Sequence, residues 1–454
     1  MENDMTRGKP LPIILKFTLP LIIGNLFQQL YNMADTIIVG RYVGPDALAA
    51  VGATGTIMFL VLGFSQGLTT GFTVLTGQAY GAGDRKRVRH SVSNGIILSF
   101  IVSAAVTVIS VVFMPTLLRM MNTPADIFDE SYTYIVIICY GATASIFYNL
   151  FSAYLRAVGN SKIPLVFLIF SAALNVVLDL VFIITFRFGV AGAALATVIS
   201  QGVSAILCLI YIYQKSEILH PKKEDWRLTR ADTAHQLTVG IPMALQFAVT
   251  AAGTMIMQAA INLFGSVAVA AYTAAGKLQG LLMQGMLSVG QAIAAYVGQN
   301  FGKGDLDRVE TGVRQSAVAS VVYSLIATVI AIALVGPSLH LFFTGEADMN
   351  LLREYALTYI KISSVFYIPL SLIFVYRNAM QACGYALMPT LGGVVELVAR
   401  LIMAAISMVL VSYTAACFCD PFAWLTTGIF DFVAYRLMMK KINKKWQGNA
   451  PIAN

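Results

Sequence analysis

Charge is scarce in this chain. Only 11% of its 454 residues are charged, against roughly 25% in an ordinary soluble domain, and 58% are hydrophobic. A surface that faces water cannot be built from so few charges. Apolar runs of about 20 residues recur along the whole length, and each is long enough to cross ~30 Å of hydrocarbon as a helix. Because these runs are continuous and too long for the strands of a β-barrel, the sequence predicts an all-α membrane protein.

Cysteine and histidine are also rare, with five and four residues. The cysteines lie in or beside apolar segments without a paired framework, so we interpret them as small hydrophobic residues. Cys417 and Cys419 form an isolated CxC pair, which is too little for a metal site. The chain contains no GxxxxGK[ST], HExxH or GxSxG motif, which argues against an ATP-driven pump or a hydrolase. We therefore expect a protein that is not an enzyme and needs no cofactor.

Twelve apolar windows predict twelve transmembrane helices in two groups of six. The first six lie near residues 13–39, 48–77, 91–114, 131–155, 163–186 and 190–213. The second six lie near residues 237–262, 268–298, 313–335, 352–381, 388–411 and 417–439. The longest polar stretch separates the two groups. We therefore predict an N-terminal lobe at 1–214, a cytoplasmic linker at 215–235, a C-terminal lobe at 236–440 and a cytoplasmic tail at 441–454.

The basic residues set the predicted orientation. With the N-terminus inside, 22 of the 30 Lys and Arg residues fall on the cytoplasmic side and five fall outside. Both termini are therefore predicted to be cytoplasmic, and the first span is interpreted as a retained anchor rather than a cleaved signal. The net charge of +8 resides in short clusters between the spans, so we attribute it to this bias and expect no nucleic-acid partner.

The two halves of the chain repeat each other. The segment Gly77–Asp84, with the sequence GQAYGAGD, recurs 221 positions later as Gly298–Asp305, with the sequence GQNFGKGD. Because each half carries an even number of spans, the two six-helix bundles should enter the membrane with the same orientation. They should therefore be related by a pseudo-two-fold axis along the membrane normal, with the substrate path between them.

An ionised acid at membrane depth raises the free energy of insertion by at least ~2.5–3.5 kcal/mol, so each such acid is expected to have a structural or functional role. Asp35 ends a polar face of the first helix, and Asn175 lies one turn before Asp179 on the same side of the fifth. Thr197 can face them from the sixth helix. Two carboxylates, an amide and a hydroxyl suit a hard cation or a proton. Two alternatives stay open: Asp35 lies at the outer water interface, or the group is a polar network that only fixes packing.

The other residues of the first-helix face are candidates for the substrate path: Asn25, Gln28, Gln29 and Asn32.

At these positions the chain resembles the multidrug and toxic compound extrusion (MATE) family. The resemblance covers nearly the whole chain and rests on Leu19-Pro20, Asp35-Thr36, both copies of the Gly-rich loop, Arg156–Asn160 before Pro164, Asn175 with Asp179, and Gly192–Thr197. It implies a bacterial-type inner-membrane exporter of drug-like, often cationic compounds, driven by inward flow of H⁺ or Na⁺. It also implies that Asp35, Asn175, Asp179 and Thr197 form a cation site in the N-terminal lobe. Pro20 would be a hinge of the first helix, and a static kink is the alternative.

The second half lacks counterparts of the two acids, because the repeat aligns Asp35 with Ile256 or Met257 and Asp179 with Ala404. We therefore expect coupling through the N-terminal lobe. Glu396 and Arg400 are one turn apart and are expected to form a structural ion pair. Further candidates for the substrate path form a polar row with nearby methionines, although membrane-core packing explains the methionines equally well. They are Gln246, Thr250, Thr254, Gln258, Met257 and Met283.

The sequence therefore favours a secondary active multidrug exporter that exchanges small organic compounds for H⁺ or Na⁺ by alternating access, as a monomer in the lipid bilayer. The alternative is a flippase for lipid-linked saccharides of a related fold. A flippase should present a strongly cationic cleft for pyrophosphate, whereas the few buried bases here have acids available. A non-transporting scaffold leaves the cost of Asp35 and Asp179 unexplained.

Overall fold

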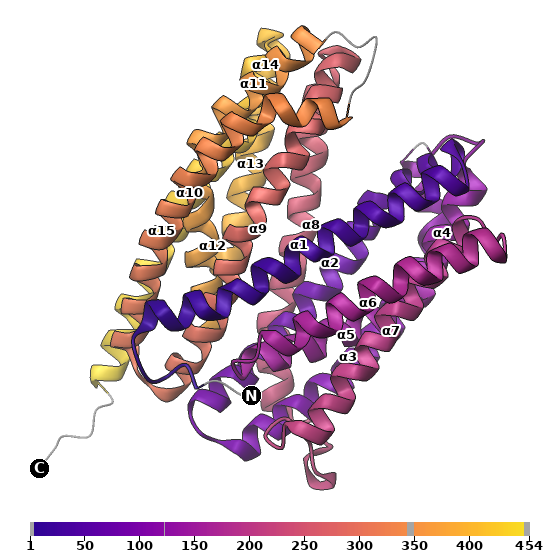
Figure 1. Ribbon diagram of the computed structural model, residues 1–454. Coiled ribbons are helices and arrows are strands. Elements are labelled where there is room, and N and C mark those ends of the chain that lie inside the picture. The colour runs from indigo at the N-terminus through magenta and orange to yellow at the C-terminus, as the bar shows by residue number, and fades with distance from the viewer. Residues whose placement is uncertain (1–3, 122, 343–348, 449–454) are drawn as a thin grey trace, which may run out of the picture. The chain divides into compact units, whose positions relative to one another are not determined.

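The computed structural model describes residues 4–121, 123–342 and 349–448, and its regular elements are all helices (Figure 1). The first half contains α1 Pro10–Tyr42, α2 Pro45–Gly81, α3 Arg85–Met120, α4 Phe128–Tyr140, α5 Ala142–Ala157, α6 Lys162–Leu180, η1 Val181–Thr185 and α7 Val190–Lys215. After the short η2 Lys223–Asp225, the second half contains α8 Arg230–Asn262, α9 Gly265–Lys303, α10 Leu306–Phe342, α11 Met349–Val365, α12 Tyr367–Ala382, α13 Leu387–Leu410, α14 Tyr413–Cys417 and α15 Cys419–Gly448.

Each of the twelve predicted spans corresponds to a helix or a pair of helices. Within the described ranges, nine helices are long and apolar enough to cross a membrane, and two bent pairs raise the number to eleven. The twelfth predicted span is α15, a continuous helix that is less apolar because it carries charges such as Asp431 and Arg436. The all-helical membrane class predicted from composition is therefore confirmed.

The two bent pairs were not predicted. α4 and α5 meet at 47°, and α11 and α12 meet at 48°. Gly141 stands at the first break, and a side chain on it would overlap Val198 of α7. Because glycine has no side chain, the bend between α4 and α5 can lie close to α7. The apolar pattern runs through both breaks without interruption, and for this reason the sequence predicted one straight span at each place.

The repeated Gly-rich loops have the same local structure in both halves. Gly83 and Gly304 adopt left-handed conformations with φ of +75° and +86°, which glycine tolerates best. The following aspartates cap the next helix: Asp84 accepts a hydrogen bond from the Arg87 N–H at 2.9 Å, and Asp305 accepts one from the Arg308 N–H at 3.1 Å. The repeat seen in the sequence is thus a repeated helix–turn–helix geometry.

The described chain forms two compact units, and their limits fall inside helices. The first unit contains residues 4–6 and 19–248, and the second contains residues 7–18 and 249–448. Both α1 and α8 therefore contribute to both units. Pro20 lies just past the change of unit in α1, and Pro242, which is 222 positions later, lies just before the change in α8. The predicted lobes divided the chain at the linker instead, since a reading by apolar windows assigns every helix to one lobe.

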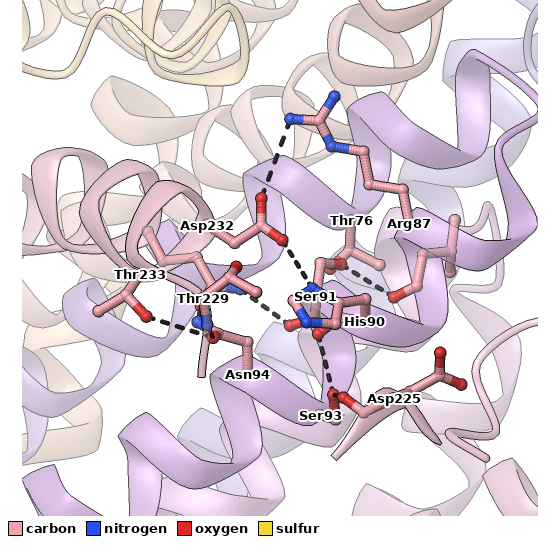
Figure 2. A network of polar contacts seen from close by, with 12 residues as sticks. Thr76, Arg87, His90, Ser91, Ser93, Asn94, Asp225, Thr229, Asp232 and Thr233 are labelled. Carbon is pink, nitrogen blue, oxygen red and sulfur yellow. Dashed lines mark hydrogen bonds and ion pairs between the residues drawn. The ribbon is translucent and has the colours of Figure 1, made fainter. Parts of the chain in front are cut away.

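The predicted linker is packed against the first unit (Figure 2). Asp225 accepts from Arg89 Nε at 3.1 Å, and His90 Nδ1 lies 2.7 Å from Asp232 Oδ2. One turn further along α3, Asn94 donates to Gln236 Oε1 at 2.7 Å, and both side chains are fully buried. These contacts fix the start of α8 on α3.

Candidate functional site

The α6–α7 hairpin of the first unit holds three of the predicted site residues. Asn175 and Asp179 lie on the last turns of α6, and Thr197 lies on α7. Both helices are labelled in Figure 1. The connection at 186–189 is short, so the two helices are antiparallel neighbours. Directly after Asp179 the helix continues as η1, one π-helical turn, and such turns are frequent at functional sites.

Asn175 joins Asp179 to α7. With the amide oriented to satisfy both neighbours, its nitrogen donates to Asp179 Oδ2 at 3.0 Å and its oxygen accepts from the Thr197 backbone N–H at 3.2 Å. Asn175 and Asp179 are fully buried, and Thr197 is 8% exposed. The amide therefore holds one oxygen of Asp179 in place, and the other, Oδ1, has no hydrogen-bond donor within the described part of the chain.

Asp35 on α1 completes the set. Its side chain is 8% exposed and faces Asp179 within hydrogen-bonding range. No residue in the ranges 4–121, 123–342 and 349–448 donates a hydrogen bond to Asp35 Oδ1 either. Two ionised carboxylates in contact repel each other, and a buried polar atom without a partner costs free energy. A proton or a cation between the two acids would remove both costs, and the role of these residues as a cation site stays a prediction.

Tyr31 also contacts this group of residues and was not predicted from the sequence. Its hydroxyl donates to Thr197 Oγ1 at 3.4 Å, and it lies one turn before Asp35 on α1. Tyrosine is common in membrane helices for packing alone. The available signal was its spacing of four residues from Asp35, which places both side chains on one side of α1.

The polar face of α1 does not point uniformly inward. Asp35 is buried, whereas the substrate-path candidates of this helix are half-buried or exposed. Asn25, Gln28 and Gln29 are half-buried, and Asn32 is exposed. The face is therefore accessible over most of its length and is closed around Asp35. Its role in a substrate path stays a prediction.

The polar row of α8 is divided between the two units. Gln246 belongs to the first unit, and the other members belong to the second. Thr250 and Gln258 are half-buried and Thr254 is exposed, and Gln258 Nε2 donates to Asn262 Oδ1 at 2.8 Å.

The two methionines proposed for the substrate path differ in burial. Met283 is partly buried against the core of the second unit. Met257 is only 1% exposed and belongs to that core, so its assignment to the substrate path is not supported. Thr254, three residues earlier on α8, is exposed, so burial changes within a single turn of this helix.

The predicted pair of Glu396 and Arg400 is in contact, with 2.9 Å between Glu396 Oε1 and an Arg400 guanidinium nitrogen. It is part of a larger network in the second unit that also includes Arg377, Asp420 and Asp431. Asp420 was not predicted as a member, because an acid in the first turn of a helix has an ordinary role at the helix N-terminus.

Comparisons with known proteins agree with this architecture. The MatE family model matches residues 20–181 and 242–406, one segment in each half. The chain is 31% identical over 308 residues to a probable multidrug resistance protein, YpnP, of Bacillus subtilis, an alignment that covers 67% of this chain and 68% of that protein. It is 26% identical to a probable multidrug resistance protein, NorM, of Thermotoga maritima, over 83% of this chain and 81% of the relative.

Among solved structures, an outward-facing multidrug resistance MATE family transporter of the MOP superfamily has the same fold. Its TM-score is 0.90 at 22% identity, and the match covers 96% of this chain and 98% of that one. The family model extends over most of the chain and includes Asp35, Asn175 and Asp179. This chain therefore belongs to the MatE family, whose members are multi-pass membrane transporters and not enzymes.

Proposed function

We propose that this chain is a secondary active multidrug exporter, which exchanges drug-like and often cationic organic compounds for H⁺ or Na⁺ by alternating access. The site of Asp35, Asn175, Asp179 and Thr197 would bind the coupling ion. The protein would act as a monomer in the inner membrane, with both termini in the cytoplasm and no nucleic-acid partner.

The observation that carries this proposal is the contact between two buried carboxyl groups in the first unit. Asp35 and Asp179 face each other, and each has one oxygen without a donor. An ion can drive a conformational cycle only if it binds one state better than another. A pair of acids that come from different helices, α1 and α6, supplies such a difference, because a movement of α1 away from α6 would separate the two carboxylates.

The rest of the site suits a small cation. The ligands are oxygens from two carboxylates, a hydroxyl and an amide, and Asn175 and Tyr31 fix the positions of Asp179 and Thr197. Hard cations prefer such oxygens, and a proton shared by the two acids satisfies the same geometry. When the positive charge leaves, repulsion between the acids favours a different position of α1, and this is how ion binding would be coupled to export.

The flippase alternative has less support. It requires buried bases that are free to bind pyrophosphate, but the two buried arginines of the second unit, Arg377 and Arg400, both lie beside carboxylates. The relatives described above bear the names of multidrug resistance proteins. We therefore propose the exporter alone.

The test uses the full chain in sealed vesicles loaded with a fluorescent organic cation. A proton gradient and a sodium gradient are imposed separately, with the membrane potential clamped, and the initial rate of efflux is recorded. We expect one of the two gradients, directed opposite to the export of the dye, to accelerate efflux well above the rate of protein-free vesicles. Equal rates with and without each gradient, from protein shown to be folded, would contradict the proposal.

A further inference from the structure

A linear network of five charged side chains runs through the second unit. Asp431 on α15 lies 3.4 Å from Arg377 Nε, and Arg377 on α12 lies 3.4 Å from Glu396 Oε2. Glu396 on α13 also binds Arg400 at 2.9 Å, and Arg400 Nε donates to Asp420 Oδ1 at 2.8 Å. Acids and bases therefore alternate, and an acid stands at each end.

Because the five residues are buried, the net charge of the network affects the stability of the protein. All five residues are at most 9% exposed, and Asp431 is fully buried. Three carboxylates and two guanidinium groups leave one negative charge without a counter-charge. Uncompensated charge is expensive in a helix bundle that crosses a membrane, so one of the acids should carry a proton or bind a cation.

The two acids at the ends of the network, Asp420 and Asp431, differ in their hydrogen bonding. Asp420 receives a short and well-aligned hydrogen bond from Arg400. Among the described residues, neither oxygen of Asp431 has a hydrogen-bond partner and Arg377 Nε also has none, so the two groups lie 3.4 Å apart without a hydrogen bond. The excess negative charge is therefore located at Asp431.

The backbone around Asp431 leaves space for its carboxyl group. A Cβ atom on Gly392 of α13 would lie 2.5 Å from Asp431 Oδ1, so only glycine permits this position of the side chain. At the other side of the network, a side chain on Gly253 would overlap the Arg400 guanidinium. Glycines from two helices thus make room for the charged groups of the network.

We propose that Asp431 is a proton-binding site of the second unit and that its proton neutralises the five-residue network. Among the described residues, the charged groups that act on Asp431 are Arg377 on α12 and Glu396 on α13. A metal cation is a poor occupant, because the Arg377 guanidinium beside the carboxyl repels it, whereas a proton makes Asp431 a neutral acid. This site is separate from the pair of Asp35 and Asp179, and it does not require that the proposed antiport be correct.

The test compares Asp431→Asn with Asp420→Asn, the same substitution at the other end of the five-residue network. Thermal unfolding of the purified full-length protein in detergent is followed between pH 5.5 and 8.5. Ionisation of Asp431 would create an uncompensated buried charge, so the wild-type midpoint should fall relative to that of Asp431→Asn as the pH rises. At pH 8.5 we expect Asp431→Asn to unfold about 2 °C or more above the wild type, whereas Asp420→Asn should unfold below it at every pH.

A lower midpoint for Asp431→Asn than for the wild type at pH 8.5 would overturn the proposal, since it would show that Asp431 is an ionised partner of Arg377. Infrared difference spectra give a second readout that does not depend on stability. At neutral pH, the difference spectrum between the wild type and Asp431→Asn should contain a carbonyl band of a protonated carboxylic acid, whereas the difference spectrum between the wild type and Asp420→Asn should not. Absence of this band from the Asp431→Asn difference spectrum would also overturn the proposal. Either result is independent of ion-driven efflux, so failure of this inference is distinguishable from failure of the proposed function.

Discussion

Replacement of Asp35 by asparagine is expected to reduce gradient-driven export by about a hundredfold while the protein remains folded in the membrane. Asparagine keeps the shape of the side chain but cannot take up a proton or offer a charge to a cation. Asp179 would then face an amide instead of an acid, and the repulsion that we propose as the source of coupling would be absent. The measurement is the initial rate of efflux of a fluorescent organic cation from vesicles, normalised to the amount of folded protein.

The matched control is Asp46→Asn, an exposed aspartate in the first turn of α2. It removes the same charge from the same unit, so its efflux rate should stay within about twofold of the wild type, as is usual for surface substitutions. Wild-type efflux from the Asp35→Asn variant would show that coupling does not pass through Asp35.

Replacement of Gly71 by valine is expected to destabilise the first unit strongly. A Cβ atom on Gly71 of α2 would overlap the backbone of Gly240 on α8, and one on Gly67 would lie 2.6 Å from the Met243 carbonyl oxygen. The two helices therefore touch backbone to backbone, as small residues allow in membranes. A backbone cannot move aside as a side chain can, so we expect a loss of about 3 kcal/mol or more.

Thermal unfolding in detergent measures this effect, and Gly52→Val is the control. Gly52 lies on the same helix, but no atom lies within 4 Å of the position that its Cβ would take. Both substitutions have the same helix propensity cost, so the difference between the two midpoints reports the contact with α8. Equal midpoints would mean that α2 and α8 are not in contact at Gly71.

Most of the fold was predictable, because the length and apolarity of a membrane span can be determined from the order of its residue types alone. The bends at Gly141 and before Tyr367 were not, since hydropathy is insensitive to the direction of a helix. The sharing of α1 and α8 between two units was also missed. It arises from packing along the length of a helix, whereas an apolar window describes a helix as a whole.

The candidate site was predictable where it depends on charge. Asp35 and Asp179 were identified because acids are rare at membrane depth, and the structure brings them together with Asn175 and Thr197. Tyr31 was not identified, because a tyrosine at this depth needs no special reason. The burial of Met257 was not visible in the sequence either: its residue type suited a substrate surface, but the side chain packs into the core of the second unit.

The central claim is that Asp35 and Asp179 act as one coupling site, and a double-mutant cycle on initial efflux rates tests it most directly. The rates of the wild type, Asp35→Asn, Asp179→Asn and the double variant are compared with and without the driving ion gradient. We predict that each single variant loses the dependence on the gradient and that the double variant is little worse than either, because groups that act as a unit are not additive. Losses that simply add, with the gradient dependence intact in either single variant, would show that the two aspartates are independent structural groups and that the coupling site lies elsewhere.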